Sequence, residues 1–181
     1  MYKRQLFYQA GIAVVITLSA VYAQLVMKFT TAQTISLILV VNITAAIGAF
    51  VFGYVQDRLG HKKTLALTIL LWIIMGVMAA FSQGPVTFWI AANIAGVAMG
   101  SSQSAGRAVV AVFAPAGELA QFYSAWNVAV WGANVLGPIT YGTVTWLTSG
   151  DQRTAILVTT LFFAIGLLIL RRVHLPNKTL A

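Results

Sequence analysis

Six long apolar stretches account for most of this chain, and they restrict its fold more than any motif does. They cover residues 6–27, 34–55, 64–82, 86–113, 120–148 and 153–171, with short polar joints between them. A helix needs about 20 mostly apolar residues to cross the hydrocarbon of a bilayer. Barrel strands alternate apolar and polar residues over about ten positions, whereas these stretches are continuously apolar. The sequence therefore predicts an all-α integral membrane protein with six transmembrane helices.

Charged residues are scarce and unevenly placed. They make up only 8% of the chain, where soluble domains carry about a quarter. Most basic residues of the joints fall on one side, namely Arg58, Lys62, Lys63, Arg171, Arg172 and Lys178, and only Lys28 and Arg153 fall on the other. By the positive-inside rule both ends are cytoplasmic. The net charge of +8 thus reflects how the chain is oriented in the membrane. We expect the lipid bilayer as a partner and do not expect nucleic acid.

The sequence offers no catalytic, cofactor or metal-binding residues. There is no cysteine, and the two histidines, His61 and His174, fall outside the apolar stretches. An intramembrane serine protease would need a histidine beside its serine inside the bundle. An intramembrane metalloprotease would need a His-Glu motif that is missing from this sequence. We therefore expect a protein that is not an enzyme.

The first five residues, Met1 to Gln5, need a separate interpretation. MYKRQ is the translation of GTG TAT AAG AGA CAG, the end of a transposon adapter used to prepare sequencing libraries. We interpret residues 1–5 as a sequencing scar, to be kept out of fold reasoning, and expect a chain truncated near Leu6. The alternative is a short basic tail. Residues 6–173 then form the helical bundle, and residues 174–181 form a cytoplasmic tail.

Polar residues gather on one face of the fourth and fifth apolar stretches. In the fourth, three- and four-residue steps connect Asn93, Gly96, Gly100, Gln103, Ser104 and Arg107, and in the fifth they connect Ser124, Asn127, Trp131, Asn134, Pro138 and Tyr141. Unpaired amides and guanidinium groups are costly in hydrocarbon, so these faces should line the bundle interior or a watery cavity. The candidate substrate-cavity residues are Asn93, Gln103, Ser104, Arg107, Asn127, Trp131, Asn134 and, from the first stretch, Gln9. The third and sixth stretches are almost uniformly apolar and suit a lipid-facing position.

Arg107 and the Gly137-Pro138 pair each allow two interpretations. The Arg107 guanidinium can bind a substrate carboxylate in the cavity, or it can reach the helix end and pair with Asp57 or Glu118. Proline inside a spanning helix bends it, so Gly137 and Pro138 predict a packing kink rather than a substrate contact.

The joint after the second stretch carries the most specific motif. It reads Gly53-Tyr-Val-Gln-Asp57-Arg58-Leu-Gly60-His61-Lys62-Lys63 and resembles the cytoplasmic loop signature of major facilitator transporters, with His61 in place of the first basic residue. Its gating residues would be Gly53, Asp57, Arg58, Gly60, Lys62 and Lys63. We expect Gly53 to allow close helix packing and Gly60 to allow a tight turn. The other interpretation is an ordinary positive-inside loop.

A weak internal repeat accompanies this motif. Gly48 and Gly53 of the second stretch correspond to Gly137 and Gly142 of the fifth. Each half of a major facilitator consists of two inverted three-helix repeats, so the repeat agrees with one half of that fold. Chance similarity between two glycine-containing helices explains it equally well.

From Phe7 to Val173 the order of features resembles the autophagy-related vacuolar effluxer family of the major facilitators, which has many bacterial members. The matching segments are NITAAIGAFVFGYVQDRLGHKKT, GSSQSAGR, FAPAGELAQFYSAW, GANVLGPITYG and GDQRTAILVTTLFF. Gln9-Ala10-Gly11 stands where the family tends to have Asn-Asp-Gly, so an acidic cavity residue is missing.

The resemblance implies a secondary transporter that moves a small solute by alternating access, in the export direction, with amino acids as the favoured class. This chain would be its C-terminal half in a bacterial inner membrane, and a missing N-terminal six-helix half would be its partner. The alternatives are a non-transporting scaffold or receptor and a stand-alone half that dimerises.

Overall fold

The structure is a computed structural model that describes residues 2–115 and 117–171. In this part of the chain it contains the helices α1 (Tyr2–Leu25), α2 (Thr31–Leu59), α3 (His61–Phe81), α4 (Pro85–Phe113), α5 (Leu119–Leu147) and α6 (Gln152–Arg171). The predicted all-α class is confirmed. The predicted cytoplasmic tail, residues 174–181, lies outside the described residues.

The observed helix bounds differ from the predicted ones by up to four residues in the first half of the chain. α1 includes residues 2–5, the segment interpreted above as a scar, and it ends at Leu25 rather than at residue 27. α2 begins at Thr31 because Thr30 and Gln33 form a capping box, which satisfies free N–H groups of the first turn. α2 then continues to Leu59, and α3 starts at His61. The joint between them is Gly60 alone, in the left-handed region at φ 78°, as expected for a turn glycine.

Three helices are long and apolar enough by themselves to cross a membrane among the described residues, namely Thr31–Leu59, His61–Phe81 and Gln152–Leu170. α4 and α5 are longer than α3 and carry the polar residues noted above. Membrane crossing by α1, α4 and α5 stays a prediction.

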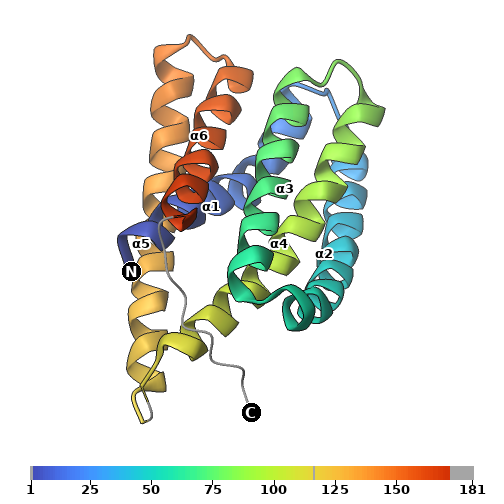
Figure 1. Cartoon of the computed structure of the whole chain (residues 1–181). Helices are drawn as coiled ribbons and strands as arrows, with labels where there is room; N and C mark the ends of the chain where they lie inside the picture. The colour runs from blue at the N-terminus through green and yellow to red at the C-terminus, as the bar shows by residue number, and fades with distance from the viewer. Residues whose placement is uncertain (1, 116, 172–181) are drawn as a thin grey trace.

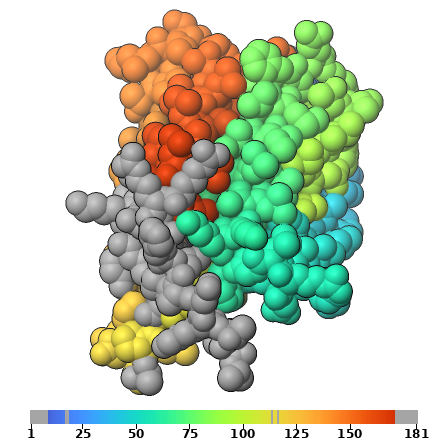
Figure 2. All heavy atoms as spheres, in the orientation of Figure 1, coloured from blue at the N-terminus to red at the C-terminus, as the bar shows by residue number. Residues whose placement is uncertain are grey.

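α1 and α4 run between two groups of helices (Figure 1). α4 packs on α2 and α3, α1 packs on α5 and α6, and α3 packs on α6. The packing is the same in both halves of the chain. If α1, α2 and α3 trade labels with α4, α5 and α6, in that order, the list of packed pairs stays the same. Figure 2 shows the face on which the surfaces of α3 and α6 meet.

Small residues allow the closest helix contacts. A Cβ atom at Gly100 would lie 1.8 Å from the Ala45 carbonyl oxygen, and one at Gly48 would lie 2.6 Å from the Val97 carbonyl oxygen, so α2 and α4 touch through their backbones. Gly137 provides the same contact between α5 and α1, where a Cβ would lie 2.4 Å from the Ala10 carbonyl oxygen. Gly48 and Gly137 are the positions that the weak internal repeat paired.

Gly53 does not make the close approach that the loop motif predicted. A Cβ atom there would meet nothing within 4 Å in the described part of the chain, and the same holds for Gly142. Both glycines lie five residues after Gly48 and Gly137, which is about 140° further around the helix at 3.6 residues per turn, so they lie on a different face from those close contacts.

Candidate functional site

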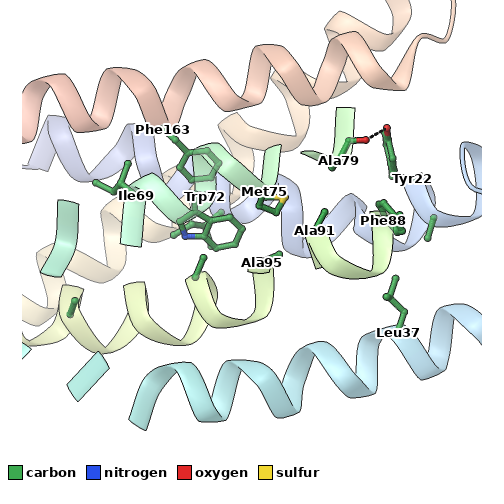
Figure 3. Packing of buried hydrophobic residues seen from close by; sticks show 14 of the residues in the cluster. Tyr22, Leu37, Ile69, Trp72, Met75, Ala79, Phe88, Ala91, Ala95 and Phe163 are labelled. Carbon is green, nitrogen blue, oxygen red and sulfur yellow. Dashed lines mark hydrogen bonds between the residues drawn. The ribbon is translucent and has the colours of Figure 1, made fainter. Parts of the chain in front are cut away.

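A cavity of about 210 Å³ lies where α1, α2, α3, α4 and α6 converge, with Tyr141 of α5 also in its lining. Figure 3 shows side chains from several of these helices around it, including Leu37 of α2, Met75 of α3 and Ala95 of α4. Ile16 and Ile38 also line it and are 51% and 44% exposed. The cavity therefore opens beside α1 and α2.

Aromatic side chains fix the wall of the cavity. Trp72 is fully buried and stacks on Phe163, with ring centroids 5.2 Å apart and planes 5° from parallel. Its indole N–H donates to the Ser102 hydroxyl at 3.4 Å. Stacked, hydrogen-bonded rings of this kind have few accessible rotamers, so the shape of this wall is set before any ligand arrives.

A second aromatic pair holds the end of the cavity near the joint between α3 and α4. The Tyr22 hydroxyl donates to the Ala79 carbonyl oxygen at 2.9 Å (Figure 3). The Tyr22 ring stacks on Phe88 at 5.6 Å, and α1 is thereby tied to both α3 and α4. A buried tyrosine needs such a hydrogen-bond partner.

The lining of the cavity is largely apolar and, among the described residues, carries no charge. Its polar members are Ser19, Tyr22, Asn42, Tyr141, Thr159 and Thr160. Most of their donors are already used within the protein. The Thr159 and Thr160 hydroxyls bond to backbone oxygens one turn back, at 2.9 and 2.8 Å, and the Tyr141 hydroxyl bonds to the Gln152 side chain at 2.6 Å.

The sequence-predicted cavity residues lie elsewhere. Gln103, Arg107, Asn127, Trp131 and Asn134 are exposed on the surfaces of α4 and α5, Ser104 is half-buried, and Gln9 is buried. Asn93 lines a separate open groove of about 580 Å³ between α2, α3 and α4, and its amide donates to the Trp89 carbonyl oxygen at 2.8 Å. None of these residues lines the 210 Å³ cavity in the part of the chain that the structure describes. Their role at a substrate site stays a prediction.

The residues that line the cavity come mainly from α1, α2 and α4, and sequence reasoning also missed those of α3 and α6, the helices expected to face lipid. Their outer faces are indeed exposed, as at Ile74 and Leu168, but Trp72 and Phe163 on their inner faces are almost fully buried. The available signal was Trp72, which lies in the middle of its stretch, whereas membrane-interface tryptophans lie near the ends.

Arg107 forms neither of the ion pairs considered for it. Within the described residues, no ion pair or hydrogen bond joins its guanidinium to Asp57 or Glu118, and its side chain is exposed. Its backbone carbonyl accepts a hydrogen bond of 3.0 Å from the Tyr123 hydroxyl, which ties α4 to α5. Arg107 lies eight residues after Met99, about 80° further around α4, and unlike Met99 it does not line the 210 Å³ cavity.

The predicted gating motif lies at the joint of α2 and α3. The Gln56 amide and the His61 ring are hydrogen-bonded across Gly60. The Arg58 guanidinium stacks over the Tyr54 ring at 4.5 Å from its centroid, and Asp57 is exposed. Within the described residues Asp57 has no hydrogen-bond or ion-pair partner, so its charge is available to another surface.

The opposite end of the bundle is held by the joint between α5 and α6. The Asp151 carboxylate accepts hydrogen bonds from the Thr154 side chain and from the Thr154 and Arg153 backbone, which hold its pKa below the ordinary value. The Arg153 guanidinium donates to the Ser82 carbonyl oxygen at 2.8 Å, where a cation is favoured at the end of α3. The stabilisation by ionised Asp151 is therefore present above the ordinary pKa of the carboxyl group and is lost as the pH falls through the lowered folded value.

Known transporters are similar to this chain in sequence and in fold. Over 173 residues the chain is 27% identical to the MFS-type transporter YxiO of Bacillus subtilis, covering 96% of this chain and 40% of that protein. Over 133 residues it is 34% identical to a protein of Haemophilus influenzae named for metabolite transport, covering 71% of this chain and 32% of that protein. The chain thus spans well under half the length of these curated relatives.

The fold matches a solved structure of the xylose transporter XylE from E. coli in an inward open conformation. The TM-score is 0.77 at 19% identity, covering 96% of this chain and 46% of the other. The model of the vacuole effluxer Atg22-like family matches residues 5–180. This chain therefore belongs to the vacuole effluxer Atg22-like family, among the membrane transporters of the major facilitator class.

Proposed function

We propose that this chain is the C-terminal, six-span half of a secondary transporter that exports a small solute by alternating access, with amino acids as the favoured class. The observation that carries the proposal is the exposed face of α5. Asn127, Trp131 and Asn134 lie there at helical spacing, between exposed apolar residues such as Val128 and Val135. Lipid would leave the two amides without hydrogen-bond partners, so water or another protein surface must cover this face.

Two further features support the pairing of this chain with an N-terminal half. The set of helix contacts stays the same when α1–α3 and α4–α6 are exchanged, and Gly48 and Gly137 make matching backbone contacts. Both features are expected of inverted three-helix repeats, which in transporters rock against a second bundle around a central site. Asp57, without a partner in the described residues, would then meet the other half at the cytoplasmic surface.

The proposed topology predicts which joints face the outside. Both ends of the segment should be cytoplasmic, because Arg58, Lys62 and Lys63 lie at one end of the bundle. In whole cells, single cysteines at Gly84 and Ser149 should react with a membrane-impermeant thiol reagent, and one at His61 should react only after the membrane is opened. Since the chain has no cysteine, the background needs no substitution in this segment. The reverse labelling pattern would overturn the orientation.

The transporter and scaffold hypotheses differ in what Gln103 and Arg107 do. If the two residues line the solute path, Gln103→Ala and Arg107→Lys should lower transport into proteoliposomes while the protein stays folded and inserted. Lysine keeps the charge of Arg107 but loses the planar fork that grips a carboxylate. We expect apparent affinity to weaken roughly tenfold, or by about 1.4 kcal/mol.

Exposed Gln33, which lies at the other end of the bundle in the Thr30 capping box, provides a polar control, because Gln33→Glu keeps the acceptor oxygen of the cap. Transport by Arg107→Lys at the wild-type affinity would remove Arg107 from the solute path. A folded protein that moves no tested solute in any form would favour the scaffold.

A further inference from the structure

We infer that the 210 Å³ cavity binds an uncharged, largely apolar group of about the size of a substituted benzene ring. This inference deepens the proposed function, on which it rests for the role of the cavity as part of the solute path. Size is the first argument. An engineered apolar cavity of about 150 Å³ in another protein takes up benzene, so a cavity of about 210 Å³ has room for a ring with one substituent.

The absence of charge around the cavity is the second argument. None of the lining residues that the structure describes is an Asp, Glu, Lys or Arg. An ion enclosed without a charged or multiply hydrogen-bonded partner is strongly destabilised. A carboxylate or phosphate inside this space would find few donors, because the hydroxyls of Thr159, Thr160 and Tyr141 already donate within the protein.

A cation would depend on the aromatic rings, since ring faces attract positive charge. Phe163 covers one face of Trp72, and Phe88 covers one face of Tyr22. The covered faces are closed to a cation, and the described lining offers no carboxylate to assist the open ones. The rings instead provide a flat, apolar, rigid wall that suits another ring.

The mouth of the cavity is the place for a neutral polar substituent. Asn42 is exposed there and uses one amide N–H in a 2.8 Å bond to the Ile38 carbonyl oxygen, which leaves its second N–H and its oxygen for a ligand. Ser19, half-buried on α1, adds a hydroxyl to the lining. Ligand pockets typically combine an apolar body with a few polar groups that set orientation. The group that fits the cavity therefore has an apolar ring inside and an uncharged hydrogen-bonding group at the mouth, and the charged ends of an amino acid would have to lie outside this cavity.

The test uses three ring compounds of nearly equal shape and different charge, namely benzamide, benzoate and benzamidinium. A ligand that binds only the folded protein raises its melting temperature. Benzamide should raise the Tm of the purified protein in a saturable way, and benzoate and benzamidinium should need concentrations roughly tenfold higher or more for the same shift, because a charge is poorly accommodated in this lining. No saturable shift with benzamide, or equal shifts with all three, would overturn the inference.

A matched pair of substitutions places the binding in this cavity. Ala95 is buried in the lining, so Ala95→Trp should fill the space and abolish the benzamide shift, whereas Ala46 is exposed on α2 and Ala46→Trp should keep it. A folded Ala95→Trp protein that still responds to benzamide would show that the site is elsewhere.

A second pair of variants decides the matter if Ala95→Trp does not fold. Ser19 lines the cavity and Ser36, exposed on α2, does not. Benzamide should slow the reaction of Ser19→Cys with N-ethylmaleimide and leave Ser36→Cys unaffected, and equal rates with and without benzamide at both positions would contradict the inference. Neither measurement involves transport. A protein that binds benzamide but moves no solute would therefore refute the proposed function alone, and a working transporter without this binding would refute the inference alone.

Discussion

Replacing Gly100 with alanine should prevent α2 and α4 from packing as they do and should cause the largest loss of folded protein among single-methyl additions. The new Cβ would lie 1.8 Å from the Ala45 carbonyl oxygen and 2.9 Å from the Ala49 nitrogen. Both are backbone atoms of α2, so no side-chain rotation relieves the overlap. Overpacking typically costs about 1–3 kcal/mol, and we expect Gly100→Ala at the upper end of that range or beyond it. Thermal unfolding in detergent measures the effect.

Gly53→Ala is the matched control for this prediction. Gly53 lies on α2 as well, and an added methyl group would meet nothing within 4 Å in the described part of the chain. The control variant should keep the wild-type melting temperature within a few degrees. Equal stability of the two variants would show that α2 and α4 do not cross where this structure has them.

Trp72→Ala should cause the second large loss of stability. The side chain is fully buried, stacks on Phe163 and bonds to Ser102, and it fills the centre of the contact between α3, α4 and α6. Helix association in lipid depends on such packing rather than on removal of apolar surface from water. Truncation of a buried tryptophan costs about 3–5 kcal/mol in soluble proteins, and we expect at least about 2 kcal/mol here from lost packing and the cavity left behind.

Two other substitutions show whether the loss of stability comes from the buried packing of Trp72 or from the removal of any tryptophan. Trp146 is 79% exposed near the end of α5, so Trp146→Ala should change stability by less than about 0.5 kcal/mol. Trp72→Phe keeps an aromatic ring against Phe163 and should fall between the wild type and Trp72→Ala. Chemical denaturation in mixed micelles would measure all three variants, and a Trp72→Ala protein as stable as Trp146→Ala would contradict the structure.

The helices could be predicted from the sequence because each one is a long and mostly apolar stretch. Their ends could not, because they depend on local hydrogen bonds. The Thr30 capping box starts α2 before its apolar stretch does. Asp57 and Arg58, assigned to a loop by their charge, are the last turn of α2, because a helix can continue past the hydrocarbon until a residue such as Gly60 ends it.

The cavity could not be predicted, because apolar residues that line it look the same in sequence as those that face outward. Ile74 and Met75 are neighbours on α3, yet Ile74 is 41% exposed and Met75 only 5%. The difference depends on where α1 and α4 pass between the two helix groups, and no local pattern encodes that path. Polar residues give a clear periodic signal in the sequence, which predicts a polar cavity. Gln103, Arg107, Asn127, Trp131 and Asn134 lie instead on exposed surfaces of α4 and α5, which the proposed N-terminal half would cover.

The most direct test of the central proposal is solute exchange by the transporter that contains this chain, reconstituted into proteoliposomes. A transporter that alternates access moves labelled solute faster when unlabelled solute is present on the opposite side. The binding site then reorients with unlabelled solute bound instead of returning empty. Small neutral and zwitterionic solutes, amino acids among them, should include at least one whose flux saturates and is accelerated in this way. The proposal would be contradicted if, for every solute tested, the flux never exceeds that of protein-free vesicles. It would also be contradicted if every flux rises linearly with concentration and is not accelerated by solute on the opposite side.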